Sequence, residues 1–409
     1  MTELKSTLER LYRLIPLGKK LGLERMQAAC AAFGNPQLAF PTVHVAGTNG
    51  KGTVTAFVAS IARANGSKVG VYTSPHLMRF AERINIGGQP ISDELLVSLL
   101  NRVMDRAPDL TFFEVATMAA FLAFQEAKVD LGVIEVGLGG RLDATNVLPP
   151  PQVVAITRIA YDHMAELGDS LGQIAAEKAG IIKRGSKVVL GKIHPEARAV
   201  IEAKAAAVGA PVVELASPEP IAGAPLAYPR VALVGSNLAV AVTVARELGI
   251  SPEVMAQGIK QTTWPGRNEL LHRSGQELTL LDCAHNPDGA VALSHALDPS
   301  VLGDIESRKE IVLVFGALST KNWRAMLRRL ETVAGHRVYV APPISRGVDP
   351  NEIAAFVPGE VANSVGEALA RARALVGPRG VVVVTGSTFL VGAARALLLN
   401  LPSDPPVAL

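Results

Sequence analysis

The sequence predicts an α/β protein of two domains, an N-terminal one with a mostly parallel sheet and a smaller C-terminal one. At 409 residues the chain exceeds the roughly 250–300 residues that one hydrophobic core usually holds. Its hydrophobic fraction of 49% is high enough to fill two cores. Short valine-rich runs also alternate with longer alanine-rich stretches, a pattern typical of strands separated by helices.

The first alternating series lies between residues 43 and 208. Expected strands cover 43–46, 69–72, 131–136, 153–157 and 187–190, and expected helices cover 53–64, 93–106, 115–128, 171–179 and 195–208. These strands are apolar throughout rather than alternating in polarity. Strands of this kind are buried on both faces, so the pattern predicts a parallel sheet that helices cover on two sides.

A second series follows a proline-rich stretch at 216–230, which we expect to form a loop. Helices are expected at 236–248, 252–260, 288–297, 322–334, 364–376 and 388–399, and strands at 278–282, 311–315, 337–341 and 381–385. The segment HRSGQE at 272–277 is polar and contains a glycine. We place the domain boundary there, which divides the chain into residues 1–272 and 273–409.

Composition argues against several classes of protein. The net charge is only +3 and no basic tract with interleaved aromatic residues occurs, so no nucleic-acid partner is expected. The two cysteines, Cys30 and Cys283, are far apart, which argues against a disulfide framework or a cysteine zinc site. No apolar run reaches the roughly 18 residues of a membrane span, and the charged N-terminus is unlike a signal peptide. We therefore expect a cytoplasmic protein without a membrane partner.

The segment GTNGKGT is the first motif that carries chemistry. It consists of Gly47, Thr48, Asn49, Gly50, Lys51, Gly52 and Thr53, between an expected strand and an expected helix. Glycines let backbone N–H groups approach a phosphate, and the start of a helix favours an anion. Lys51 would reach the terminal phosphates, and Thr53 would offer a hydroxyl to Mg²⁺. A plain glycine turn is the alternative. The chain lacks G-x-G-x-x-G and N-K-x-D motifs here, which favours ATP over a dinucleotide or GTP.

Three polar residues lie at or just beyond the carboxyl ends of expected strands, where open α/β sheets bind ligands. Glu135 is near the end of 131–136, His163 follows 153–157, and Ser74 follows 69–72. Serine and glutamate oxygens suit Mg²⁺, and histidine is a less usual ligand for it. Structural roles are the alternative: the carboxylate could accept N–H bonds from its loop, and the histidine could serve packing alone.

Eight motifs, in this order, resemble the folylpolyglutamate synthase / dihydrofolate synthase family of the Mur ligase group. They are TVHVAGTNGKGT, YTSPHLMRFAERI, IEVGLGGRLDATN, YDH, EKAGIIK, PGR, DCAHNPDG and TGS. The resemblance runs from about residue 20 to about 395, and the family's phosphate loop has the form G-T-N-G-K-G-[ST]. It implies an N-terminal P-loop ATPase-like domain of the Mur ligase central type and a Rossmann-like C-terminal glutamate-ligase domain.

The resemblance also implies roles for individual residues. In the N-terminal half, Gly47 to Thr53 would hold ATP, Lys51 would be catalytic, and Thr53, Ser74, Glu135 and His163 would hold Mg²⁺, as two ions. Lys178 of EKAGIIK matches a family lysine that CO₂ carbamylates, and it would also be catalytic. The acceptor would contact Gly22, Leu23, Glu24 and Arg25 of the GLERM segment, together with Ala144.

Further implied roles concern ATP and glutamate. Asn237, Arg267 and Asp282 would bind ATP, whereas His285, Lys321 and Ser387 would bind substrate, with His285 also catalytic. The chain departs from the family at Asn322, where an acidic residue is frequent, and at Thr388 and Phe389, where some relatives have histidine. These departures concern the recognition of glutamate.

The implied reaction joins L-glutamate to a carboxylate with ATP, through an acyl phosphate. The GLER stretch favours two activities, on dihydropteroate and on reduced folates, in a monomer. Folylpolyglutamate synthesis alone is one alternative. A cell-wall Mur-type ligase is another, although roughly 42 residues before the first expected strand cannot hold a UDP-binding domain. A non-catalytic nucleotide-binding protein is the third.

Overall fold

The computed structural model describes residues 2–15, 22–216, 232–272, 278–298, 311–377 and 380–404. The chain forms two compact units. The first contains residues Met1–His76, Phe80–Pro225 and Gly235–Thr263, and the second contains Leu77–Arg79, Leu226–Val234 and Trp264–Leu409. Most of the expected loop at 216–230, and of the segment 272–277, lies outside the described residues.

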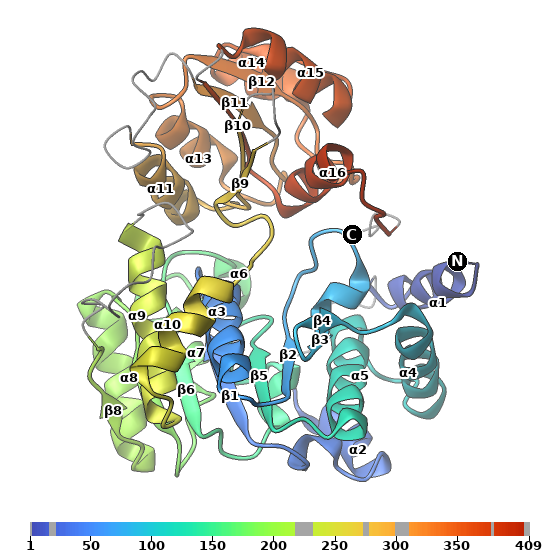
Figure 1. Ribbon diagram of the computed structural model, residues 1–409, viewed down its shortest axis with the longest axis vertical. Coiled ribbons are helices and arrows are strands. Elements are labelled where there is room, and N and C mark those ends of the chain that lie inside the picture. Colours follow the sequence, from blue (N-terminus) through green and yellow to red (C-terminus); the bar gives the residue numbers. More distant parts are fainter. Residues whose placement is uncertain are drawn as a thin grey trace. The chain divides into compact units, whose positions relative to one another are not determined.

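The first unit is built on an eight-stranded sheet in the order β4-β3-β2-β5-β1-β6-β7-β8. Its strands are β1 (Thr42–Ala46), β2 (Val69–Tyr72), β3 (Ile84–Ile86), β4 (Gln89–Pro90), β5 (Leu131–Glu135), β6 (Val153–Ile156), β7 (Lys187–Leu190) and β8 (Val212–Val213). All neighbours pair in parallel except β2 with β3 and β3 with β4. Because β1 lies between β5 and β6, the loop after β1 is flanked by the carboxyl ends of both (Figure 1).

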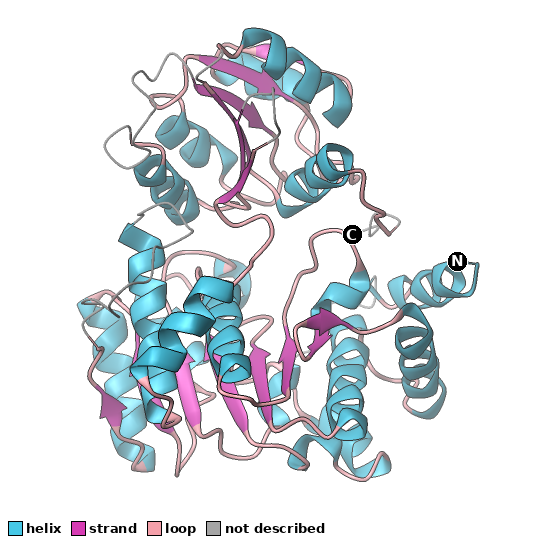
Figure 2. Cartoon of the chain, in the orientation of Figure 1, coloured by secondary structure: helices cyan, strands magenta, loops and turns pink. Residues whose placement is uncertain are grey.

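Helices cover the sheet of the first unit (Figure 2). They are α1 (Thr2–Tyr12), α2 (Glu24–Ala32), α3 (Lys51–Ala64), α4 (Asp93–Arg106), α5 (Phe112–Ala127), α6 (Met164–Leu167), α7 (Leu171–Ala179), α8 (Pro195–Val208), α9 (Ala232–Glu247) and α10 (Pro252–Gln261). One buried cluster joins α1, α2, α4 and α5 to β2 and β5, and another joins α7 and α8 to β6 and β7. Apolar strands thus bury both faces, as the sequence predicts.

At Gly258, where α10 crosses α3, the two helix backbones approach so closely that only glycine fits. A Cβ on Gly258 would lie 2.4 Å from the Cα of Ile61. The Ser60 hydroxyl also donates to the Gly258 carbonyl at 2.8 Å. Helix α3, which begins in the GTNGKGT segment, is therefore held from its outer side by α10.

A six-stranded sheet in the order β13-β12-β11-β14-β10-β9 forms the second unit. Its strands are β9 (Glu269–Leu271), β10 (Leu278–Leu281), β11 (Ile311–Phe315), β12 (His336–Tyr339), β13 (Glu360–Val361) and β14 (Val381–Thr385), and its helices include α11 (Pro287–Ala296), α13 (Trp323–Leu330), α14 (Pro350–Phe356), α15 (Val365–Leu375) and α16 (Thr388–Leu399). Only β9 is antiparallel to its neighbour. Residues 269–271 group with this unit because β9 pairs with β10, so the division falls at 263–264 rather than at 272–273.

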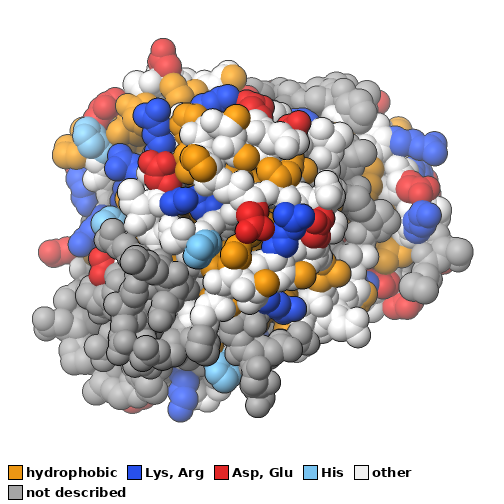
Figure 3. All heavy atoms as spheres, turned by 90° about the horizontal axis from the view of Figure 1, so that it is seen from above, with side chains coloured by type: hydrophobic (Ala, Val, Ile, Leu, Met, Phe, Trp, Pro, Cys, Tyr) orange, Lys and Arg blue, Asp and Glu red, His pale blue; other side chains and the backbone are white. Residues whose placement is uncertain are grey.

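The predicted α/β class, with a large and mostly parallel sheet before a second sheet, is confirmed. None of the described helices is long and apolar enough to cross a membrane. Basic and acidic side chains are interspersed on the face shown in Figure 3, as the nearly balanced composition of 40 basic and 37 acidic residues leads one to expect.

Candidate functional site

The loop between β1 and α3 is fixed by its own backbone geometry and by the segment after β6. Gly47 has a φ of 151°, and a Cβ there would lie 1.8 Å from the Thr157 hydroxyl oxygen. That hydroxyl donates to the carbonyl of Asn49 at 2.8 Å. The Thr48 N–H donates to the carbonyl of Arg158 at 2.7 Å. A loop held in this way presents the start of α3 in one fixed position, as anion binding requires.

Lys51 is the first residue of α3, and its ammonium group faces the end of β5. Its Nζ donates to the Thr48 carbonyl at 3.2 Å and lies 4.0 Å from Glu135 Oε1. The other carboxylate oxygen of Glu135 accepts the backbone N–H of Ser74 at 3.2 Å. The glutamate is only 4% exposed. The structure therefore brings three predicted residues, Lys51, Ser74 and Glu135, together at the carboxyl edge of the sheet.

Asn237 of α9 lies against the same loop. Gly50 caps α3 with a φ of 89°, and a Cβ there would lie 2.4 Å from Asn237 Oδ1. The carboxamide therefore packs on the loop backbone itself. Thr53 lies in the first turn of α3, two residues after Lys51.

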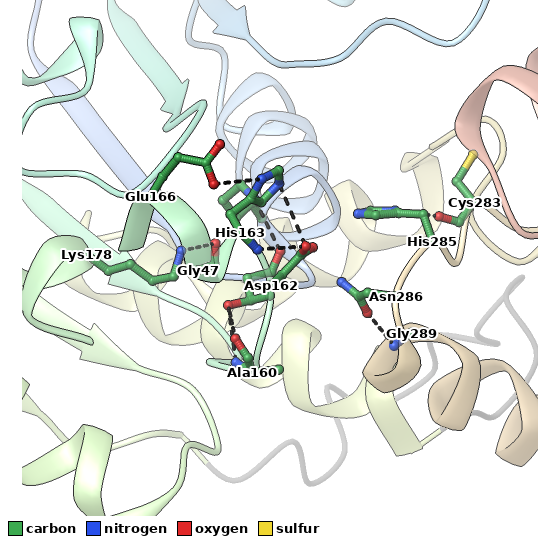
Figure 4. A network of polar contacts seen from close by, with 12 residues as sticks. Gly47, Ala160, Asp162, His163, Glu166, Lys178, Cys283, His285, Asn286 and Gly289 are labelled. Carbon is green, nitrogen blue, oxygen red and sulfur yellow. Dashed lines mark hydrogen bonds and ion pairs between the residues drawn. The ribbon is translucent and has the colours of Figure 1, made fainter. Parts of the chain in front are cut away.

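His163 precedes α6 in a left-handed conformation, with a φ of 51°. Its Nε2 lies 3.9 Å from Asp162 Oδ1, and its Nδ1 lies 4.0 Å from Glu166 Oε2 (Figure 4). Two carboxylates thus flank the ring. Within the described parts of the chain, no three His, Cys, Asp or Glu side chains gather as a metal site.

Lys178 is buried near the end of α7, and its amine donates to the carbonyl of Gly47 at 2.9 Å (Figure 4). Burial, together with the positive charge of Lys51, lowers the pKa of this amine to about 7. A substantial fraction of the amine is therefore neutral near pH 7. Only the neutral amine can attack an electrophile such as CO₂, so burial prepares Lys178 for the predicted modification.

The loop after β5 packs tightly on α7 and so determines where Lys178 lies. A Cβ on Gly140 would lie 2.8 Å from the Glu177 carbonyl and 3.0 Å from that of Lys178. The Arg141 N–H donates to the Glu177 carbonyl at 2.8 Å. Glycine at position 140 of the GLGGR sequence thus allows loop and helix backbones to touch.

Replacing Gly140 with alanine should destabilise the protein by about 1–3 kcal/mol, because the new methyl group meets rigid backbone rather than a movable side chain. Urea denaturation would measure the loss. Gly377→Ala is the matched control, because a Cβ at Gly377 meets nothing within 4 Å. Equal stability of the Gly140 variant and the wild type would contradict this account of the loop.

The predicted acceptor residues lie on elements that contact one another. Gly22 and Leu23 precede α2, and Glu24 and Arg25 are its first two residues. Ala144 begins the 3-10 helix η4 (Ala144–Val147). Helix α2 contacts both η4 and α5. The Arg25 guanidinium itself is paired with Glu114 of α5, at 2.9 Å between Nη2 and Oε1.

In the second unit, the turn that carries Arg267 docks on the strand end that carries Asp282. The Cys283 N–H donates to the Gly266 carbonyl at 2.9 Å, and the Asn268 N–H donates to Asp282 Oδ2 at 2.9 Å. Burial raises the pKa of Asp282, an effect that the Arg267 charge opposes. Two residues predicted to bind ATP, Arg267 and Asp282, are therefore electrostatic neighbours.

His285 lies at the start of α11, beside its N-cap Asn286, whose side chain accepts the Gly289 N–H at 2.8 Å (Figure 4). The Nδ1 of His285 lies 2.9 Å from the carbonyl of Cys283. A carbonyl can only accept, so Nδ1 carries the proton in the neutral ring. The Nε2 atom is then the acceptor.

Side chains in the region predicted to bind glutamate also cap helices. Ser387 is the N-cap of α16, and its hydroxyl accepts the Phe389 N–H at 3.2 Å. Asn322 is the N-cap of α13, and its side chain accepts the Ala325 N–H at 3.2 Å. The departure from an acidic residue at 322 therefore retains an N-cap. Lys321 directly precedes this cap.

Comparison with known proteins shows which family the chain belongs to. Residues 45–214 match the Mur ligase middle domain, and residues 266–388 match the Mur ligase glutamate ligase domain. The dihydrofolate synthase/folylpolyglutamate synthase of Bacillus subtilis is 34% identical over 94% of this chain and 96% of that protein. The chain belongs to the folylpolyglutamate synthase / dihydrofolate synthase family. It is therefore an ATP-dependent acid–amino-acid ligase.

Two further proteins show how widely the family likeness extends. The folylpolyglutamate synthase of Lacticaseibacillus casei is 36% identical over 90% of this chain and 92% of that protein. The bifunctional folylpolyglutamate synthase/dihydrofolate synthase of Yersinia pestis, complexed with AMPPNP and a Mn ion, superposes with a TM-score of 0.85. That structure is 32% identical and covers 97% of this chain and 98% of its own.

In this member of the folylpolyglutamate synthase family, the loop that follows β5 contains a buried network that the sequence did not predict. The Thr145 hydroxyl donates to Asp143 Oδ1 at 2.5 Å. With its proton used in this way, the hydroxyl oxygen accepts from His44 Nε2 at 2.8 Å. Leu138 N–H donates to Asp143 Oδ2 at 2.8 Å. Burial lowers the pKa of His44 to about 3, so the ring is neutral. The sequence signal for this network is His44, the one polar residue in the expected strand VHVA, because a buried polar group needs a hydrogen-bond partner.

The residues of the ligase suit a hard divalent cation. Glu135 is a buried carboxylate near an ammonium group, and the predicted ligands Ser74 and Thr53 carry hydroxyl oxygens. Oxygen ligands of this kind are those that Mg²⁺ prefers, with phosphate and water completing its coordination. These oxygen donors fit the cation, and His163 is the one predicted ligand that would offer a nitrogen.

Proposed function

We propose that this ligase adds L-glutamate to the carboxylate of dihydropteroate and of reduced folates, using ATP and Mg²⁺. The observation that carries the proposal is the convergence of Lys51, Ser74 and Glu135 beside the GTNGKGT loop. Phosphoryl transfer depends on such positioned charges more than on covalent chemistry by the protein. The Bacillus subtilis and Yersinia pestis relatives are named for both activities, which supports both here.

The reaction needs the acceptor carboxylate to become a better electrophile. Transfer of the ATP γ-phosphoryl group to it forms an acyl phosphate, which the glutamate amine then attacks, releasing phosphate. Lys51 and Arg267 neutralise negative charge during the transfer. No protein nucleophile is required in this scheme.

Thr53, Ser74, Glu135, His163 and a carbamylated Lys178 are proposed to hold two magnesium ions. The ions supply positive charge to the phosphate groups of ATP. Carbamylation converts the Lys178 amine into a carboxylate-like group, and its lowered pKa supports that conversion. Gly47 to Thr53, Asn237 and Asp282 complete the proposed ATP site.

The acceptor is proposed to contact Gly22, Leu23, Glu24 and Ala144, and glutamate to contact His285, Lys321 and Ser387. We assign ATP binding chiefly to the N-terminal domain and glutamate ligation to the C-terminal one. The functional form is proposed to be a cytoplasmic monomer.

An assay of the two acceptors tests the proposal. Purified protein should release phosphate when ATP, Mg²⁺ and L-glutamate are supplied with either dihydropteroate or tetrahydrofolate. Turnover of tetrahydrofolate alone would leave folylpolyglutamate synthase activity only, the single activity for which the Lacticaseibacillus casei relative is named. Turnover only with UDP-muramyl substrates would make the protein a cell-wall ligase and would overturn the proposal.

A further inference from the structure

Arg25 occupies a position that helix electrostatics disfavours. It is the second residue of α2, where the partial positive charge of the helix terminus repels a cation. The N-cap residue, Leu23, makes no side-chain capping bond. A guanidinium at such a place needs a negative partner, and the structure supplies one from another helix.

That partner is Glu114, in the first turn of α5. Its Oε1 accepts Arg25 Nη2 at 2.9 Å, and its Oε2 accepts Arg25 Nε at 3.2 Å. Oε2 also accepts the backbone N–H of Thr111 at 2.8 Å, which completes the capping box of α5. Glu114 is only 4% exposed. The Arg25 side chain is 26% exposed, so the pair is partly buried. A two-pronged pair of this kind fixes both the distance and the angle between the groups.

The pair joins the starts of two helices whose neighbours belong to the site. On one side, Arg25 ends the Gly22–Arg25 stretch. On the other side, Phe113 adjoins Glu114, and a Cβ on Gly137 would lie 2.4 Å from Phe113 Cζ. Gly137 is two residues after Glu135. A continuous set of contacts therefore runs from the start of α2, through the first turn of α5, to the loop after β5.

We propose that Arg25 is a positioning residue that acts through Glu114, rather than a direct ligand of the acceptor. Both oxygens of Glu114 hold the guanidinium, so the Arg25 fork is directed at α5. The pair sets the place of Gly22–Glu24 relative to the first turn of α5. This inference rests on the proposed function, in which Gly22–Glu24 contact the pteroate part of the acceptor.

Two single variants and their combination test the inference. Arg25→Gln and Glu114→Gln should each raise the KM for dihydropteroate at least tenfold and leave the KM for ATP and for glutamate within about twofold. In Glu114→Gln, the amide oxygen of the new side chain can still accept the Thr111 N–H, so α5 keeps its cap. The double variant should be no worse than either single variant, because both remove one interaction. Arg25→Lys should lie between, since an ammonium group cannot reproduce the fork.

The control is another pair that α5 makes, far along the helix. Nη2 of Arg102 in α4 lies 2.5 Å from Oε1 of Glu126 in α5, and both side chains are about two-fifths exposed. Arg102→Gln should leave all three KM values unchanged.

The possible outcomes separate the alternatives. If Arg25→Gln raises the KM for dihydropteroate and Glu114→Gln does not, the arginine contacts the acceptor directly and the inference is wrong. Unchanged KM values in both variants, or an equal rise for all three substrates, would also overturn it. A wild-type protein inactive with every pteroate or folate would refute the proposed function, and this inference with it. Normal wild-type turnover beside unaffected variants would refute the inference alone.

Discussion

Replacing Lys51 with alanine should lower the rate of phosphate release at least a hundredfold while the fold remains intact. The Lys51 ammonium is held by the Thr48 carbonyl and lies 4.0 Å from Glu135, beside the phosphate loop. Loss of one positioned charge-stabilising group typically costs about 10²–10³ in kcat. The measurement is phosphate release with glutamate and tetrahydrofolate, together with the thermal unfolding midpoint.

Lys204→Ala is the control for a lysine without a role in the site, because Lys204 is exposed on α8. It should retain wild-type turnover. The Lys51 variant should also unfold within a few degrees of the wild type, since alanine has at least the helix propensity of lysine. Wild-type turnover by Lys51→Ala would remove the GTNGKGT loop from the mechanism.

Replacing Lys178 with methionine should lower the activity at least a hundredfold, because the loss of one positioned charge-stabilising group typically has an effect of this size. The same replacement should abolish carbamylation. Methionine fills a similar volume but cannot form a carbamate. In the wild type, ¹³C-bicarbonate should give a carbamate signal by NMR. The pKa of Lys178 is lowered to about 7. The signal should therefore grow as the pH rises through that value, because the amine loses its proton there.

Lys183 provides a control, because it is a partly buried lysine close to the end of α7. Burial lowers its pKa to about 8, and its Nζ donates to the carbonyls of Asn146, at 2.8 Å, and Leu148. Lys183→Met should keep the carbamate signal. A signal that survives in Lys178→Met and disappears in Lys183→Met would place the modification on Lys183 and contradict the prediction.

Local sequence patterns predicted the long elements of the fold well. The strands β1, β2, β5, β6 and β7 begin within one residue of the predicted positions, because apolar runs between glycine or polar residues are unambiguous. Helix α5 begins at Phe112 rather than at 115. The capping box formed by Thr111 and Glu114 marks this start.

Short elements escaped prediction for a different reason. The two-residue strands β4, β8 and β13 are too short to show any periodicity. They exist because a neighbouring strand offers unpaired N–H and C=O groups at a sheet edge. Similarly, β9 is recognisable only through its antiparallel pairing with β10. Pairing partners of this kind are set by tertiary structure.

The sequence by itself determined the chemistry that is possible: a glycine loop with Lys51, a carboxylate at a strand end, and a family likeness spread over both domains. Local residue order is enough for these, because loop conformation and strand burial follow from neighbouring residues. Only the tertiary structure decided that Lys178 is buried against Gly47, which makes its pKa low, and that Arg25 is occupied by Glu114. Lys178 and Gly47 are 131 positions apart in the sequence, and Arg25 and Glu114 are 89 positions apart. Contacts over such separations depend on the tertiary structure, so no local sequence pattern predicts them.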